Sequence, residues 1–241
     1  MFDKDGILFE AKQFWLALAR ARVEKLQEWL GTDTVSLFYD TFGIIHREGT
    51  IVDVDPSGVF AIASPQEEQT ITAALVYKST SFSWEKCRNI VHELYEQVDR
   101  EVDLTQALKP KPGFPGIFRK LRRANVPYGI ATSDDYSRTR DSIARFDSWK
   151  GLHFVMTPTE VTQGKPHPEM LQRVSQLMGV DSRQLMMIGD SAVDMIMARN
   201  AGAIAVGIPE YAVMKERMAP YADAIIPSLN DIHILTREEK K

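Results

Sequence analysis

The sequence predicts an α/β fold in which a parallel β-sheet is flanked by helices and joined to a second, mainly helical region. From residue 126 onward, short apolar stretches alternate with stretches of helical periodicity. This alternation is typical of a parallel sheet with helices on both faces. Before residue 110 helical patterns dominate, and the breaker-rich stretch PKPGFPG at 110–116 marks a candidate boundary between the two regions.

Composition limits the class of protein. The 241 residues are 44% hydrophobic and 26% charged, as in an ordinary globular protein, and the net charge of −4 gives no electrostatic footprint for nucleic acid. No apolar run approaches the roughly 18 residues of a membrane span, so we expect no membrane partner. The single cysteine, Cys87, suggests a reducing compartment, and we expect a cytoplasmic protein. The five histidines are scattered without ligand spacing, which disfavours a zinc site.

The first region is predicted to hold helices and one hairpin. Apolar residues recur at helical spacing over 12–30, and Gly31 ends that helix. Residues 51–63, IVDV-DPSG-VFAIA, read as two strands joined by a turn and predict a β-hairpin. Ser64-Pro65-Gln66-Glu67 is a capping box with proline at the first helical position, and a further helix is expected after Ser83.

The second region is predicted to alternate strands and helices. The expected strands are 126–132, 152–157, 185–190 and 203–208, and the expected helices are 136–146, 168–179 and 191–202. In open parallel sheets, ligands bind beyond the carboxyl ends of the strands. The polar residues at those ends are therefore the candidates for a functional site.

Reactive side chains stand at the expected strand ends. They are Asp3, Asp5, Thr132, Ser133, Lys165, Asp190 and Asp194. Carboxylates gathered on one rim repel one another unless a cation lies among them, and a set of oxygen ligands without histidine or cysteine favours Mg²⁺. A lysine and a hydroxyl on the same rim can hold an anion. Together these groups indicate phosphoryl transfer, in which a spare carboxylate can attack phosphorus.

The stretches FDKDG, GIATSDD, GKPHPEM and IGDSAVDMIMARNAG resemble, in this order, the four motifs of the haloacid dehalogenase-like superfamily. The resemblance is closest to its phosphoglycolate phosphatase-like members. It implies a Rossmann-like catalytic core formed by 1–10 and 111–241. Residues 11–110 resemble the family's inserted helical cap in position and helix content, here with the hairpin predicted near 51–63. Such a cap closes over the site and selects the substrate.

The resemblance also implies roles for single residues. Asp3 would be the nucleophile, and Asp5 would protonate the leaving oxygen and then deprotonate the hydrolytic water. The phosphoryl group would be bound by residues of the first three motifs, namely Gly6, Thr132, Ser133 and Lys165. Mg²⁺ would be held by the Asp3 carboxylate, the Asp5 carbonyl, the Asp190 carboxylate and, directly or through water, Asp194.

Two departures from the family pattern are visible. The family usually has threonine after the glycine of the first motif, whereas Ile7 stands here, so a hydroxyl that would help fix the nucleophile's loop is missing. Only Met1 and Phe2 precede Asp3, whereas a central strand takes about five residues. We therefore expect the natural start to lie upstream of Met1.

The expected activity is Mg²⁺-dependent hydrolysis of a small phosphorylated metabolite through an aspartyl phosphate. The acidic residues of 11–110 outnumber its basic ones, which fits a small substrate better than a polyanion. Arg20 and Arg22 could reach a second anionic group of the substrate, but a solvated helix face is the favoured interpretation.

Alternatives stay open on the sequence alone. A phosphomutase can share these motifs, and a catalytically impaired relative that only binds a phosphorylated ligand would explain Ile7 and the short first strand. A dehalogenase is disfavoured because Asp5 and the Mg²⁺ carboxylates would have no task. Phosphonate-hydrolysing relatives usually lack the second aspartate, so Asp5 disfavours them too. The identity of the substrate and the oligomeric state are open.

Overall fold

The computed structural model describes residues 1–235, and the chain divides into two compact units. The core unit consists of Met1–Glu10 together with Lys109–Lys241, and the inserted unit consists of Ala11–Leu108. Within the described residues, no helix has both the length and the apolar composition needed to cross a membrane.

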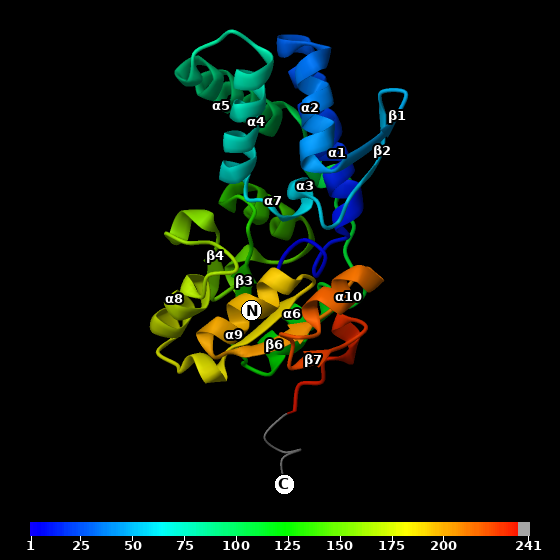
Figure 1. Cartoon of the computed structure of the whole chain (residues 1–241). Coiled ribbons are helices and arrows are strands. Elements are labelled where there is room, and N and C mark those ends of the chain that lie inside the picture. Colours follow the sequence, from blue (N-terminus) through cyan, green and yellow to red (C-terminus); the bar gives the residue numbers. More distant parts are fainter. Residues whose placement is uncertain (236–241) are drawn as a thin grey trace. The chain divides into compact units, whose positions relative to one another are not determined.

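The core unit alternates helices and strands along the chain (Figure 1). In order these are α6 (Gly116–Arg123), β3 (Gly129–Ala131), α7 (Tyr136–Phe146), η2 (Trp149–Gly151), β4 (Phe154–Met156), η3 (Pro158–Glu160), α8 (Glu169–Met178), η4 (Ser182–Gln184), β5 (Met186–Gly189), α9 (Ala192–Ala201), β6 (Ile204–Gly207), α10 (Ala212–Met218), β7 (Ala224–Ile225) and η5 (Leu229–Asp231). The predicted α/β fold is confirmed.

The strands of the core unit are parallel, and the amino-terminal residues lie at the centre. β3 pairs with β4, and β5, β6 and β7 pair in that order. Phe2 forms parallel bridges to both β3 and β5 and so joins the two groups of strands. The Phe2 N–H donates to the Gly129 carbonyl at 3.0 Å, and the Asp3 N–H donates to the Ile188 carbonyl at 2.9 Å. This short segment brings Asp3 to the sheet's carboxyl edge.

Methionine supplies much of the apolar packing in the core unit. Met170, Met187, Met195, Met197 and Met218 are fully buried in one hydrophobic cluster with apolar side chains of β4, α8 and α9. Flexible thioethers fill irregular space well, and their burial agrees with the composition of these helices and strands. The strand ends that carry polar residues are therefore anchored on a continuous apolar layer.

The two connections between the units run side by side within the core unit. The Glu10 N–H donates to the Lys109 carbonyl at 2.8 Å, and the Lys111 N–H donates to the Leu8 carbonyl at 2.9 Å. Phe9 and Pro110 form an antiparallel bridge between them. The chain thus leaves the core unit and returns to it at neighbouring points.

The inserted unit is mainly helical (Figure 1). Its elements are α1 (Ala11–Leu30), α2 (Thr32–Phe42), β1 (Ile44–Arg47), β2 (Thr50–Val54), α3 (Val59–Ile62), α4 (Pro65–Ser79), α5 (Trp84–Glu101) and η1 (Leu104–Ala107). The capping box at Ser64 is confirmed: its hydroxyl accepts from the Glu67 N–H, and the Glu67 carboxylate accepts from the Ser64 N–H.

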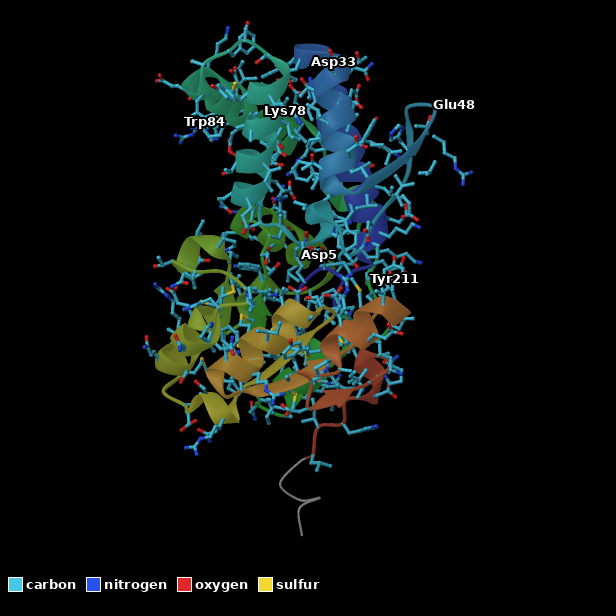
Figure 2. All side chains as sticks on the ribbon, viewed as in Figure 1. Asp5, Asp33, Glu48, Lys78, Trp84 and Tyr211 are labelled. Atoms are coloured by element: carbon cyan, nitrogen blue, oxygen red, sulfur yellow. The ribbon has the colours of Figure 1, made fainter. Side chains whose placement is uncertain are left out.

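The hairpin predicted over 51–63 is wrong in its position. β2 pairs antiparallel with β1, the strand that precedes it in the chain. Glu48 and Gly49, with φ of 48° and 77°, form the turn at the tip of this hairpin (Figure 2). Two central residues with positive φ match the right-handed twist of paired strands. DPSG instead forms a turn, closed by the Gly58 N–H and the Asp55 carbonyl at 2.9 Å, that leads into α3.

Arg22 does not lie on a solvated helix face. It is fully buried, forms an ion pair with Glu68 of α4, and stacks over the ring of Tyr95 at 4.1 Å. Arg20 donates to the Ile51 carbonyl at 3.2 Å. Both arginines therefore take part in contacts among the elements of the inserted unit.

Candidate active site

The loop after Phe2 is closed by its own backbone. The Leu8 and Phe9 N–H groups donate to the Lys4 carbonyl at 2.9 and 3.2 Å, and the Gly6 N–H donates to the Phe9 carbonyl at 2.9 Å. Ile7 is buried, with 1% of its surface exposed. Backbone hydrogen bonds and burial of Ile7 thus hold the loop without the hydroxyl of the usual threonine.

Gly6 lets this loop approach the end of β5. Its φ of 78° lies in the left-handed region, and a Cβ on Gly6 would stand 2.0 Å from Oδ2 of Asp190. Its carbonyl accepts from Nζ of Lys111 at 2.7 Å, and its N–H already donates to Phe9. Gly6 therefore allows close backbone approach to Asp190, and its role in phosphate binding stays a prediction.

Three buried carboxylates meet at the edge of the sheet. Asp3 follows the central segment, Asp190 follows β5, and Asp194 lies in the first turn of α9; one oxygen of each lies within 4.8 Å of the others. Asp194 also accepts from the Ser191 hydroxyl at 2.6 Å. Gly189 makes room for it, since a Cβ there would stand 2.3 Å from the Cβ of Asp194. These three predicted metal ligands are brought together.

Lys165 joins this group from the loop before α8. Its Nζ donates to Oδ1 of Asp3 at 2.7 Å and to Oδ1 of Asp194 at 2.6 Å, and only 3% of its side chain is exposed. The loop is held by Glu169, whose carboxylate accepts from the Thr162 N–H at 3.0 Å and the Gln163 N–H at 2.8 Å. The lysine predicted from the third motif therefore lies against the predicted nucleophile.

Burial dominates the electrostatics of the three carboxylates. It raises the pKa of Asp3 to about 7; Lys165 opposes this rise, and Asp194 adds to it. Burial, followed by the charges of Asp3 and Asp194, raises the pKa of Asp190 well above its usual range. The two carboxylates beside Lys165 raise its pKa, so it stays charged. The cluster holds more negative charge than one lysine can offset.

Thr132, Ser133 and Asp5 complete the predicted site. Thr132 follows β3, is buried, and accepts from the Asp134 N–H at 3.1 Å through its hydroxyl. Ser133 is half-buried beside it. The Asp5 carboxylate is not one of the three clustered carboxylates and lies against Lys4 instead. Its predicted contribution to the metal is through its carbonyl oxygen, and that role stays a prediction.

Two lysines in this region were missed by the sequence interpretation. Lys4 is fully buried and contacts Asp5 and Asp134, and Lys111 donates to the Gly6 carbonyl. Lys4 lies between two aspartates in FDKDG, yet a lysine in a charged run is usually solvated, and nothing in the sequence marks it as buried. Lys111 stands in the breaker cluster, where no periodicity places it.

The donor set fits Mg²⁺. Asp190 is buried, with only 6% of its surface exposed. Within residues 1–235 its carboxylate nevertheless makes no hydrogen bond or ion pair. Asp3 and Asp194 each have one oxygen on Lys165. Burial of several carboxylates with insufficient counter-charge is unfavourable unless a cation is bound, and hard oxygen ligands suit magnesium, as they suit calcium and manganese.

The chain is similar to curated proteins described as phosphatases. The chain is 28% identical over 150 residues to "Probable phosphatase IndB" of Dickeya dadantii, covering 61% of this chain and 57% of that protein. It is 29% identical over 115 residues to the phosphoglycolate phosphatase of Escherichia coli K12, covering 46% and 45%. The chain spans about half the length of the curated relatives it matches.

The fold has solved counterparts. The crystal structure described as a predicted phosphoglycolate phosphatase from Haemophilus somnus superposes with a TM-score of 0.65 at 15% identity, covering 95% of this chain and 93% of that one. The family model described as haloacid dehalogenase-like hydrolase matches residues 30–208, a range that begins after the Asp3 loop. Because this range is well over half of the sequence, the chain belongs to the haloacid dehalogenase-like hydrolase family.

Proposed function

We propose that the protein is a Mg²⁺-dependent phosphatase that hydrolyses a small phosphorylated metabolite through an aspartyl phosphate on Asp3. The observation that carries this proposal is the contact of Lys165 with both Asp3 and Asp194, next to Asp190, at one edge of the sheet. A nucleophile, a fixed cation and two further carboxylates are the parts that phosphoryl transfer requires. The relatives described as phosphatases support the reaction class.

In the first step an oxygen of the Asp3 carboxylate attacks phosphorus, and the bond between phosphorus and the ester oxygen breaks. The leaving oxygen takes a proton from Asp5 and departs as an alcohol. Lys165 and Thr132 hold the phosphoryl oxygens. Lys165 also offsets the charge on Asp3, with which it shares a hydrogen bond of 2.7 Å.

In the second step Asp5, now a carboxylate, accepts a proton from water, and the water oxygen attacks phosphorus. The bond between phosphorus and the Asp3 oxygen breaks, which releases inorganic phosphate and restores the Asp3 carboxylate. Asp3, the Asp5 carbonyl, Asp190 and Asp194 would hold the magnesium ion. When bound, this ion neutralises charge on the carboxylates and on the phosphoryl oxygens. The role assigned to residues 11–110 in selecting the substrate stays a prediction.

The test is hydrolysis of p-nitrophenyl phosphate by wild type and Asp3→Asn, with Mg²⁺ or with chelator. We expect release of inorganic phosphate by wild type with Mg²⁺ only, and none by Asp3→Asn, whose circular dichroism should match wild type. Asp181→Asn is the matched control, since Asp181 is an exposed helix cap paired with Arg183, and its activity should be unchanged. Turnover by Asp3→Asn would remove Asp3 as nucleophile. In a parallel assay with a phosphosugar as substrate, an isomerised phosphosugar in place of free phosphate would favour a phosphomutase.

A further inference from the structure

Lys4 has a position that the proposed reaction does not use. It stands between Asp3 and Asp5 in the sequence, and its side chain is fully buried. Its Nζ lies 2.8 Å from Oδ1 and from Oδ2 of Asp5, and 2.9 Å from Oδ2 of Asp134. The ammonium therefore lies between two carboxylates and contacts both oxygens of the one predicted to move the proton.

Asp134 extends this contact to the second motif. Its carboxylate is 9% exposed and binds Arg138 of α7, with Nε at 2.9 Å and a terminal nitrogen at 2.7 Å. Its N–H donates to the Thr132 hydroxyl oxygen at 3.1 Å. Asp134 thus links Lys4 with the strand end that carries Thr132 and with the first turns of α7.

A buried charge network of this kind needs a reason beyond stability. Removing charged groups from water is costly, and apolar residues of similar size can often replace buried ion pairs without loss of stability. Such a network does fix side-chain geometry, because each member has only one arrangement that keeps all its partners. The residue fixed here is Asp5, whose position relative to the leaving oxygen decides whether it can transfer a proton.

We propose that Lys4 is a positioning residue for proton transfer: anchored by Asp134, it holds the Asp5 carboxyl group where its acid form gives a proton to the leaving oxygen and its carboxylate form then accepts one from water. This inference rests on the proposed function, because it assigns a task to Asp5 within that reaction. Lys4 does not contact the phosphoryl group in this assignment. Its ammonium is occupied by two carboxylates and has no exposed surface, whereas Lys165 contacts the nucleophile itself.

The experiment compares two substrates of similar size that differ in their need for an acid. The p-nitrophenolate ion is a weak base and leaves without protonation, whereas phenolate is a stronger base and leaves faster when protonated. The measured quantity is the ratio of kcat/KM for p-nitrophenyl phosphate to kcat/KM for phenyl phosphate. Because kcat/KM covers only the steps up to departure of the alcohol, the ratio reports on the acid. The ratio is also independent of the fraction of enzyme that is folded.

Lys4→Met should raise this ratio at least about ten-fold, because phenyl phosphate loses its proton donor and p-nitrophenyl phosphate does not need one. Asp5→Asn sets the upper limit of the effect. Asp134→Asn, which leaves Lys4 in place but weakens its anchor, should raise the ratio less. Lys109→Met is the control, since Lys109 is a nearby exposed lysine paired with Glu10 at 2.7 Å, and the ratio should not change.

The outcomes separate the two proposals. If wild type hydrolyses neither ester, or if Asp5→Asn leaves the ratio unchanged, the proposed reaction fails and the role of Lys4 fails with it. A raised ratio in Asp5→Asn together with an unchanged ratio in Lys4→Met would overturn the inference alone, whatever the loss of total activity. A raised ratio in both, with no change in Lys109→Met, supports it.

Discussion

Gly6 shows how a single residue without a side chain shapes this site. Gly6→Ala would place a methyl group 2.0 Å from the Asp190 carboxylate, at a φ of 78°. The left-handed conformation alone costs roughly 1–2 kcal/mol for alanine. We expect Gly6→Ala to lower the free energy of unfolding by about 3 kcal/mol or more, because the contact adds to the backbone cost, and to abolish phosphatase activity. Urea denaturation and p-nitrophenyl phosphate hydrolysis measure the two effects.

Gly202→Ala is the matched control for this prediction. Gly202 also lies in the core unit with a positive φ, 74°, but nothing lies within 4 Å of the Cβ that alanine would add. Gly202→Ala should lower the free energy of unfolding by the backbone cost alone, about 1–2 kcal/mol, and the variant should keep its activity. Equal losses of stability in the two variants would contradict the assignment of the extra cost to contact with Asp190.

At the same scale, the sequence predicted the position of the carboxylates and Lys165 well and their partners poorly. Asp190 follows, and Asp194 caps, an element with a clear apolar pattern, so their common edge could be predicted; Asp3, preceded by only two residues, was placed beside them by its motif. Lys4 could not be assigned, because its burial depends on Asp134 folding back from a distant strand end. Contacts of this kind depend on side-chain packing, which no local pattern contains.

Among the elements, α8 matters for the loop that carries Lys165. Glu169, the first residue of α8, accepts from the Thr162 and Gln163 N–H groups and from Arg173. Hydrogen bonds from the Thr162 N–H, from Arg173 and from the Gln163 N–H, in that order, lower the pKa of Glu169 to about 2, so it is ionised at any working pH. The carboxylate is thus a charged acceptor that closes the loop onto the start of the helix.

We expect Glu169→Gln to lower kcat/KM for p-nitrophenyl phosphate about ten-fold, because a loosened loop misplaces Lys165 relative to Asp3. Steady-state kinetics on purified protein provide the measurement. Arg173→Ala separates the two sets of contacts: it removes the exposed ion pair at 2.7 Å but leaves the loop bonds, and it should retain most activity. An Arg173→Ala variant as impaired as Glu169→Gln would show that the ion pair, and not the loop, matters.

The elements also show where periodicity misleads. IVDV is a strand as predicted, but its partner is the preceding stretch IIHR and not the following VFAI. The sequence predicts the strand IVDV correctly but places the turn after it instead of before it, because DPSG is a stronger turn signal than Glu48-Gly49. Glutamate seldom adopts positive φ, so Gly49 is the one local turn signal between the two strands.

For the whole molecule, the buried carboxylates link stability to pH. Burial raises the pKa of Asp190 well above its usual range, and that of Asp3 to about 7. Without metal, the folded state therefore binds more protons than the unfolded state from about pH 4 upward. The stability that these protons contribute is present at low pH and is lost as pH rises through the folded-state pKa.

Asp190→Asn should remove the part of this loss of stability that Asp190 causes as pH rises. With chelator at about pH 7, we expect the variant to be more stable than wild type by about 1–3 kcal/mol, because the buried carboxyl group loses its proton freely only in the unfolded state whereas an amide does not titrate, and the difference should shrink toward pH 4. Mg²⁺ should stabilise wild type and not the variant. Urea denaturation at several pH values gives these differences directly. A variant less stable than wild type at neutral pH would show that the Asp190 carboxylate is already compensated in the metal-free protein.

The paired connections at Glu10 and Lys109 have a consequence for how such proteins diversify. Because the Glu10 N–H and the Lys109 carbonyl are hydrogen-bonded, the polypeptide between them begins and ends at one place on the core. The entropic cost of holding the two ends of an inserted segment together grows only with the logarithm of its length. The core sheet is therefore disturbed little when the segment between Glu10 and Lys109 is exchanged, shortened or duplicated. A descendant can acquire a new insert in one event while it inherits Asp3, Lys165 and their chemistry intact.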